Sequence, residues 1–221
     1  MSTIPASRAA GNDAKSRRTT TPAAAHYEAL LRQLQLALPA NASPAIGVTS
    51  CLPGQGTSAA AANLAVAAAN VSRQALLVDA NVEHGSVGKV FKVSAERGLS
   101  DFLSSEASTF SFDETTDGLI SASSVENLSL MLPGRSGGSR QPCYDSRTVG
   151  ELIDTLKHIF QFTVFDLPVA NELTTCFSLA SRLDGVLLVM SPGKVTEVQA
   201  KRAVQQLRNA KCEILGAVWI E

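Results

Sequence analysis

Short, almost uninterrupted apolar runs recur along the chain from Ile46 onward, and stretches with helical spacing separate most of them. The runs that predict strands are AIGVTS, QALLVDA, LSLML, FTVFDL, GVLLVMS and EILGAVWI. The stretches that predict helices are residues 58–70, 148–159, 173–182 and 195–210. Strands that are apolar on both sides and connected through helices indicate a parallel sheet buried on both faces. The pattern therefore predicts an α/β fold, a doubly wound, mostly parallel sheet with helices on both faces.

The residues before this pattern divide into two segments. Residues 1–25 are rich in Ala, Ser, Thr and Pro and carry more basic than acidic side chains, so we expect a disordered, mildly basic tail. Residues 26–42 contain HYEALLRQLQLAL, with leucines at helical spacing, followed by the breaker PANASP. They predict an amphipathic helix and a linker. Residues 43–221 form the predicted main domain, and the stretch GRSGGSRQPCYDSR within it is typical of a mobile loop.

Composition narrows the class of protein. With 221 residues, 45% hydrophobic and 18% charged, the chain can bury one substantial core. A net charge of -1 gives no general attraction for nucleic acid, so no nucleic-acid partner is expected. No apolar run reaches the ~18 residues of a membrane span and no signal sequence is evident, which predicts a cytoplasmic protein. The four cysteines and three histidines are scattered, without zinc or disulfide spacing, and are expected in packing or on the surface.

The segment IGVTSCLPGQGTSAAAANLA, residues 46–65, has the pattern of a strand, a glycine-bearing turn and a helix start. Such a turn can hold a phosphate, because backbone N–H groups point inward where a helix begins and the helix dipole favours an anion. Gly54 and Gly56 permit this backbone path, Gln55 and Thr57 complete the loop, and Ser58 offers a hydroxyl for Mg²⁺. A P-loop has lysine where this chain has Thr57. Taken alone, PGQGTS is equally consistent with an ordinary glycine turn before a helix.

Two acids end predicted strands, Asp79 in ALLVDAN and Asp166 in FTVFDLP. Ligands of parallel sheets bind at the carboxyl ends of the strands, where both acids should lie. Asp79 could orient an attacking water or hold Mg²⁺ through water, and Asp166 is suited to the same ion. Either acid alone could instead cap the turn that follows it. Three strand-end motifs together favour a phosphate site, with Ser58, Asp79 and Asp166 as the Mg²⁺ ligands.

These motifs resemble those of the bacterial tyrosine kinases of polysaccharide export, the CpsD/CapB group within the MinD/ParA branch of P-loop ATPases. The resemblance covers residues 28–221 and is carried by VTSCLPGQGTSAAAANLAVAAA, ALLVDANVEHGSVGKVF, GLSDFL, and FTVFDLP followed by SRLDGVLLVM. It implies a P-loop NTPase-like fold and ATP or ADP with Mg²⁺ as the ligand. It also implies a membrane-embedded partner, a polysaccharide co-polymerase, chain-length or export protein.

The chain departs from that family at positions that contact the ligand. Relative to the family pattern, Thr57 replaces the loop lysine, Asn81 the second aspartate of D-x-D and Glu83 the arginine after it. Thr175 stands for an aspartate after the third motif, and Ile220 for an asparagine that recognises adenine. The sequence also ends without a tyrosine-rich tail, leaving Tyr27 and Tyr144. The resemblance thus implies that the catalytic roles of Asp79 and Asp166 are vestigial.

The resemblance and the departures together predict a catalytically impaired, tyrosine-kinase-like regulator or scaffold of exopolysaccharide or capsule biosynthesis. It would lie in the cytoplasm or at the inner face of the membrane through its partner, and could self-associate. ATP or ADP with Mg²⁺ would bind weakly, and no cofactor would be required. An active ATPase or tyrosine kinase is the alternative, with the missing charge supplied by Lys89, Lys92 or Lys194. A ParA/MinD-like positioning ATPase is the second alternative, which Thr57 and Leu52 disfavour because that branch has lysines at both positions.

Overall fold

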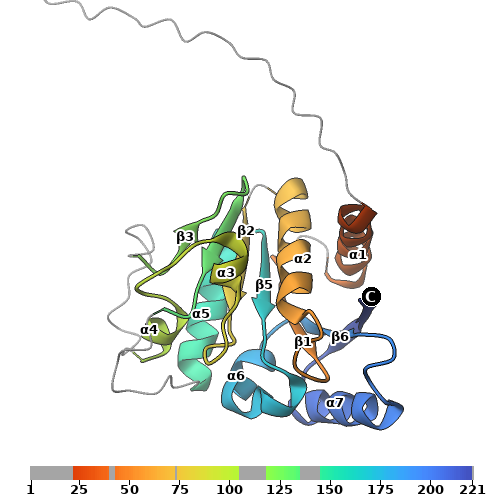
Figure 1. Ribbon diagram of the computed structural model, residues 1–221. Coiled ribbons are helices and arrows are strands. Elements are labelled where there is room, and N and C mark those ends of the chain that lie inside the picture. Colours follow the sequence, from red (N-terminus) through yellow and green to blue (C-terminus); the bar gives the residue numbers. More distant parts are fainter. Residues whose placement is uncertain (1–21, 40–42, 73, 105–117, 135–144, 221) are drawn as a thin grey trace, which may run out of the picture.

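A computed structural model describes residues 22–39, 43–72, 74–104, 118–134 and 145–220 (Figure 1). Its centre is a seven-stranded sheet in the order β3-β4-β2-β5-β1-β6-β7. Every pairing is parallel except β3 with β4. The strands are β1 Ala45–Ser50, β2 Ala75–Asp79, β3 Ser121–Ala122, β4 Leu128–Met131, β5 Phe162–Asp166, β6 Gly185–Met190 and β7 Ile214–Trp219. This mostly parallel sheet confirms the predicted α/β fold class.

The apolar runs arise because the central strands are buried on both faces. In β2, Leu76 and Val78 point into one hydrophobic cluster, whereas Ala75 and Leu77 point into the cluster on the opposite face. Successive side chains of a strand point to opposite faces, so a strand covered on both sides is apolar at every position. Helices α1 and α2 contribute to one cluster, and α4, α5, α6 and α7 contribute to the other.

The helices agree with the predicted ones in the central and C-terminal parts of the chain. Their bounds are α1 Pro22–Ala37, α2 Thr57–Val71, α3 Val87–Phe91, α4 Leu99–Ser104, α5 Ser146–Ile159, η3 Ala170–Cys176, α6 Phe177–Ala180 and α7 Glu197–Asn209. The helix α1 begins at Pro22, four residues before the predicted start at His26, and residues 1–21 of the predicted tail lie outside the described residues. Most of the predicted mobile loop, residues 135–144, does so too.

One predicted helix is divided in two. Residues 173–182 were predicted as a single helix, but the structure has the 3-10 helix η3 followed by the short α6. Hydrophobic spacing does not separate the two helix types, because apolar residues recur every three to four positions in both. Among the described helices, none has both the length and the apolar composition needed to cross a bilayer.

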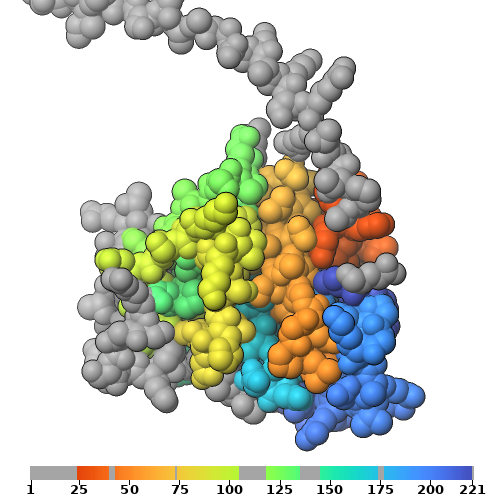
Figure 2. Space-filling view, in the orientation of Figure 1, coloured from red at the N-terminus to blue at the C-terminus, as the bar shows by residue number. Residues whose placement is uncertain are grey.

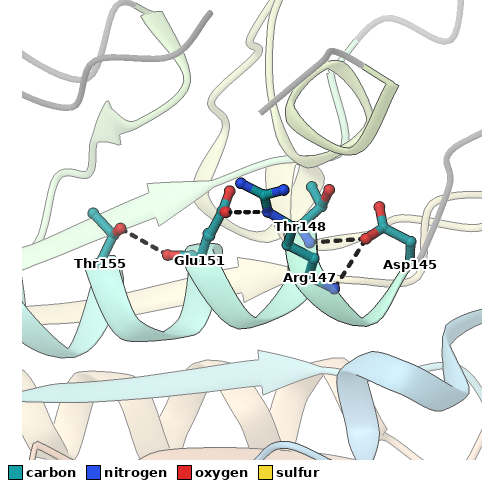
Figure 3. A network of polar contacts seen from close by, with 5 residues as sticks. All are labelled: Asp145, Arg147, Thr148, Glu151 and Thr155. Atoms are coloured by element: carbon teal, nitrogen blue, oxygen red, sulfur yellow. Dashed lines mark hydrogen bonds and ion pairs between the residues drawn. The ribbon is translucent and has the colours of Figure 1, made fainter. Parts of the chain in front are cut away.

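The start of α5 shows how local polar groups fix a helix end (Figure 3). The Asp145 carboxylate accepts hydrogen bonds from the backbone N–H groups of Arg147 (2.9 Å) and Thr148 (3.0 Å). These are donors that a helix start otherwise leaves unpaired. One turn later, Arg147 forms an ion pair with Glu151 at 2.9 Å. The cap therefore sets the first residue of α5 at Ser146, two residues before the predicted start.

The topology brings the ends of β1, β2 and β5 to one edge of the sheet. The strand β5 lies between β2 and β1, and Asp79 is opposite Asp166 in the β2–β5 register. Figure 2 shows the segments that follow these strands, in orange, yellow and cyan, meeting on one face of the molecule. The predicted functional residues thus come from neighbouring strands.

Candidate nucleotide-binding site

The loop between β1 and α2 has the backbone of a phosphate-binding turn. Gly54 and Gly56 have φ angles of 73° and 80°, in the left-handed region that glycine adopts without strain. The helix α2 begins at Thr57, and Gly56 at its N-cap has no side chain with which to cap it. The first-turn N–H groups of this 15-residue helix therefore remain available to an anion, which the helix dipole also favours.

Side chains inside the loop hold this shape. The Leu52 N–H donates to Gln55 Oε1 (3.3 Å), and the Ser50 hydroxyl donates to the Leu52 carbonyl (2.9 Å). The Gln55 side chain is turned into the protein and is only 3% exposed. The Thr49 hydroxyl donates to the Pro168 carbonyl (2.6 Å), which ties the loop to the segment after β5. Gln55, predicted to bind nucleotide, thus uses its side chain to support the loop and could meet a phosphate only through its backbone.

Asp79 and Asp166 form a buried carboxylate pair at the carboxyl ends of β2 and β5. Their exposed fractions are 0% and 1%. Within the described part of the chain, Asp79 Oδ1 and Asp166 Oδ2 have no hydrogen-bond partner. The second oxygen of Asp79 accepts from the Val87 N–H (3.0 Å), and Asp166 accepts from the Ser58 hydroxyl. Each acid therefore directs one unpaired oxygen into a region with little water.

Burial dominates the acidity of both groups. Loss of hydration raises the pKa of Asp79 to about 6, although backbone N–H groups at Val87, Asn81 and Ser86 oppose the shift. Burial raises the pKa of Asp166 to about 7, the Ser58 hydroxyl opposes this, and the nearby charge of Asp79 adds to it. When both acids are ionised, their charges repel each other. Among the described residues, no cationic side chain contributes to the pKa of either acid.

This donor set fits Mg²⁺. The ion prefers oxygen ligands and keeps several waters, so one or two carboxylates and a hydroxyl suffice on the protein side. Ser58, Asp79 and Asp166 supply such oxygens, and the unpaired carboxylate oxygens are those that a cation would satisfy. A bound Mg²⁺ would also offset the repulsion between the two acids and would supply positive charge for a phosphate.

A cleft of about 480 Å³ lies between the loop after β1 and the segments after β2 and β5. Its wall brings together most of the predicted site: Gly54, Gly56, Thr57, Ser58 and Asp166, with Asn81, His84, Ser86 and Glu172 beside them. Asp79 lines a neighbouring cavity of about 550 Å³, together with Glu83, Lys89 and Lys92. The volume of the cleft suits a small-molecule ligand.

Positive charge is scarce in this cleft. Among the described residues of its wall, none is a lysine or an arginine. Lys89 and Lys92, which the sequence offered as replacements for the loop lysine, line the neighbouring cavity instead, and Lys194 lines neither. His84 does line the cleft, although the sequence predicted only packing or surface roles for the histidines. Its position three residues after Asn81, in a strand-end segment, was the available signal.

The segment after β2 explains two of the departures from the kinase pattern. Asn81 Oδ1 accepts the His84 N–H (3.3 Å), so the amide caps a turn. Glu83 is exposed and faces the neighbouring cavity. Ile220 approaches the loop from β7: its Cδ1 lies 3.8 Å from where a Cβ on Gly56 would stand. The Thr175 side chain lies outside the described ones.

The chain is similar in sequence to proteins named as bacterial tyrosine kinases. It is 27% identical over 192 residues to the tyrosine-protein kinase YwqD of Bacillus subtilis, covering 87% of this chain and 78% of that protein. It is also 27% identical over 195 residues to the tyrosine-protein kinase CpsD of Streptococcus pneumoniae, covering 87% and 82%. No protein-family model matches the chain.

Solved structures give the same fold. The chimerical protein CapA2B2 superposes with a TM-score of 0.78 at 24% identity, covering 92% of this chain and 86% of that one. The septum site-determining protein MinD of Pyrococcus horikoshii, complexed with Mg-ADP, gives a TM-score of 0.64 at 23% identity, covering 80% and 69%. The chain thus has a P-loop NTPase-like fold. Within that class, the chain resembles the bacterial tyrosine kinases, as the motifs predicted.

Proposed function

We propose that this chain is a catalytically impaired, tyrosine-kinase-like P-loop protein that regulates or scaffolds the biosynthesis and export of exopolysaccharide or capsule. The resemblance to the CpsD/CapB group supplies the biological setting. One observation supports the impairment: the cleft contains the glycine loop and two candidate Mg²⁺ ligands, Ser58 and Asp166, but no lysine or arginine among the described residues of its wall.

Binding and phosphoryl transfer depend differently on that missing charge. A charge-assisted hydrogen bond contributes about 1.5 to 3 kcal/mol, so a cradle of backbone N–H groups with Mg²⁺ can still hold a nucleotide weakly. Transfer of a γ-phosphoryl group relies mainly on positioned positive charge around the transition state. The expected result is weak binding of ATP or ADP with Mg²⁺ and very slow turnover, with no nucleotide required for folding.

Tyr27 is poorly placed as a phosphate acceptor. Its ring packs against the hydrophobic cluster beneath α1 and α2. Burial raises the pKa of its hydroxyl, and a hydrogen bond with the Asn63 side chain opposes that shift. To enter a kinase site, the side chain would have to leave this packing. Tyr144, the other tyrosine, lies outside the described residues.

The proposed protein acts through its partners. By analogy with the CpsD/CapB group, it docks on a membrane polysaccharide co-polymerase, chain-length or export protein, from the cytoplasmic side, and it self-associates. The kinase-like fold then provides the docking surface, while the cleft reports whether nucleotide is bound.

An active ATPase or tyrosine kinase is the second candidate, because Ser58, Asp79 and Asp166 of the family pattern remain in the sequence. This candidate needs a cation from another molecule, such as the membrane partner. A positioning ATPase of the ParA/MinD kind would need positive charge from another molecule at two positions, Thr57 and Leu52.

Titration calorimetry and turnover assays on the full chain test the proposal. We expect an affinity for Mg-ATP no better than high micromolar, hydrolysis near the buffer rate, and no phosphotyrosine after incubation with ATP. Asp166→Asn is the control, because any heat that comes from this cleft should change in that variant. Tight binding, or ATP-dependent phosphate on Tyr27 or Tyr144, would contradict the impairment. Hydrolysis that appears only with the membrane partner would establish the second candidate.

A further inference from the structure

His84 is distinguished from the rest of the cleft wall by its chemistry. Among the described residues that line the cleft, it has the only side chain able to carry a positive charge. The other ionisable groups there are Asp166 and Glu172, both acids. Without a cationic or donor group opposite the loop, these acids would repel a nucleotide phosphate.

The segment that carries His84 is anchored on both sides of it. Asp79 accepts hydrogen bonds from the backbone at Asn81, Ser86 and Val87, so the segment folds around a buried carboxylate. The His84 N–H donates to the Asn81 carbonyl (3.2 Å) as well as to its side chain. At Gly85, a Cβ would lie 2.9 Å from Asp79 Oδ2, so only glycine allows this close approach. The backbone of His84 is therefore positioned before any ligand arrives.

The ring itself is exposed, and His84 lines the same cleft as Gly54, Gly56 and Thr57 of the loop. A neutral imidazole has one N–H donor and a protonated imidazole has two, so either form can donate to a phosphate oxygen. Thr57, by contrast, offers only a short hydroxyl in the place of the long loop lysine. His84 thus adds a longer side-chain donor to a wall on which the loop supplies backbone N–H groups and short hydroxyls.

We propose that His84 contacts the phosphates of a nucleotide bound in this cleft and takes over part of the role of the absent lysine. The inference rests on the proposed nucleotide site and adds a specific residue to it. It would also give a cleft with two acids, and no lysine or arginine in its described wall, a side-chain donor for an anion.

The test is calorimetric titration of the full-length protein with Mg-ADP, comparing wild type with His84→Ala and His84→Lys. His84→Ala should weaken binding about tenfold, the loss expected for one hydrogen bond to a charged group. His84→Lys should bind at least as tightly as wild type, because it keeps a donor and a charge. His158→Ala is the matched control: His158 is exposed on α5 and pairs with the Asp154 carbonyl of its own helix. It should bind as wild type does.

A second measurement uses only the wild type, so it tests the proposal even if His84→Ala does not fold. In wild type, the NMR signal of the His84 ring should shift on addition of Mg-ADP, whereas that of His158 should not. Binding by wild type with equal affinity in His84→Ala, or with no shift at His84, overturns this proposal and leaves the nucleotide site standing. No binding by wild type and no ring shift overturns both.

Discussion

Replacing Asp166 with asparagine should stabilise the protein, and the gain should be larger at pH 8 than at pH 5. Burial raises the pKa of this carboxyl from 3.8 to about 7. The folded state therefore holds the proton more tightly than the unfolded chain, and the free energy of unfolding falls as the pH rises through that interval. The free-energy cost of burying the charged carboxylate is fully present above the folded-state pKa. It vanishes below the unfolded-state pKa. Asparagine has nearly the same shape and no charge to bury.

The magnitude follows from the two pKa values. They differ by about 3, and at about 1.4 kcal/mol per pKa unit this corresponds to roughly 4 kcal/mol at pH 8. Asp79 supplies part of the shift, and the amide of the introduced asparagine must find a partner for its N–H groups, so we expect a gain of about 2 to 4 kcal/mol. By the same linkage relation, about 2 to 3 kcal/mol of that gain should disappear between pH 8 and pH 5.

Urea denaturation without Mg²⁺, at pH 5 and pH 8, measures this difference. Asp145→Asn is the control of opposite sign, because hydrogen bonds from Thr148, and then from the Arg147 backbone, lower the pKa of Asp145. That replacement should give no gain at pH 8. A gain for Asp166→Asn that is equal at both pH values would refute the electrostatic explanation. A loss of stability at pH 8 would mean that the Ser58 hydrogen bond outweighs desolvation.

Three further predictions concern the same edge of the sheet. Thr57→Lys should raise the affinity for Mg-ATP roughly ten- to a hundredfold, the effect of one charged hydrogen bond, while ATP hydrolysis stays slow. Calorimetry measures the affinity. A folded variant that does not bind ATP would mean that the loop is closed. Mg²⁺ at ten times its dissociation constant should stabilise the wild type at pH 8 by about 1.4 kcal/mol in thermal unfolding, and Asp166→Asn should lose most of this. Gly85→Ala should lower the free energy of unfolding by about 1 to 3 kcal/mol, because its Cβ would stand 2.8 Å from Pro133 Cγ and 2.9 Å from Asp79 Oδ2. Urea denaturation measures this loss. An unchanged midpoint would show that the segment moves freely.

The sequence predicted the long, doubly buried elements of the fold and missed the short ones. Burial on both faces makes a central strand apolar throughout, a signal that survives in the sequence alone. The strand β3 has two residues, Ser121–Ala122, and pairs antiparallel at the edge of the sheet, so it has no such run. The helices α3 and α4 have five and six residues, too few to show a periodic apolar face.

The sequence predicted which residues end the strands, but not which of them become neighbours. Any parallel arrangement brings Asp79 and Asp166 to one edge. Only the strand order, with β5 between β2 and β1, sets them opposite each other in register. Strand order depends on packing between distant segments, which local patterns do not encode. Local patterns also do not show where the Gln55 and His84 side chains lie. Gln55 is turned inward and accepts a hydrogen bond from the Leu52 N–H, whereas His84 reaches the cleft because its segment folds around Asp79.

The retained acids and the missing lysine bear on different steps. Two buried carboxylates without a cation cost stability above neutral pH, and a single asparagine at either position would relieve that cost. A purely structural scaffold has no need of the pair, whereas a site that still meets Mg²⁺ does. Phosphoryl transfer also requires fixed positive charge. Among the described residues of the cleft wall, only the His84 side chain can carry one. Under the proposed function, the site is therefore better suited to binding a nucleotide than to hydrolysing it.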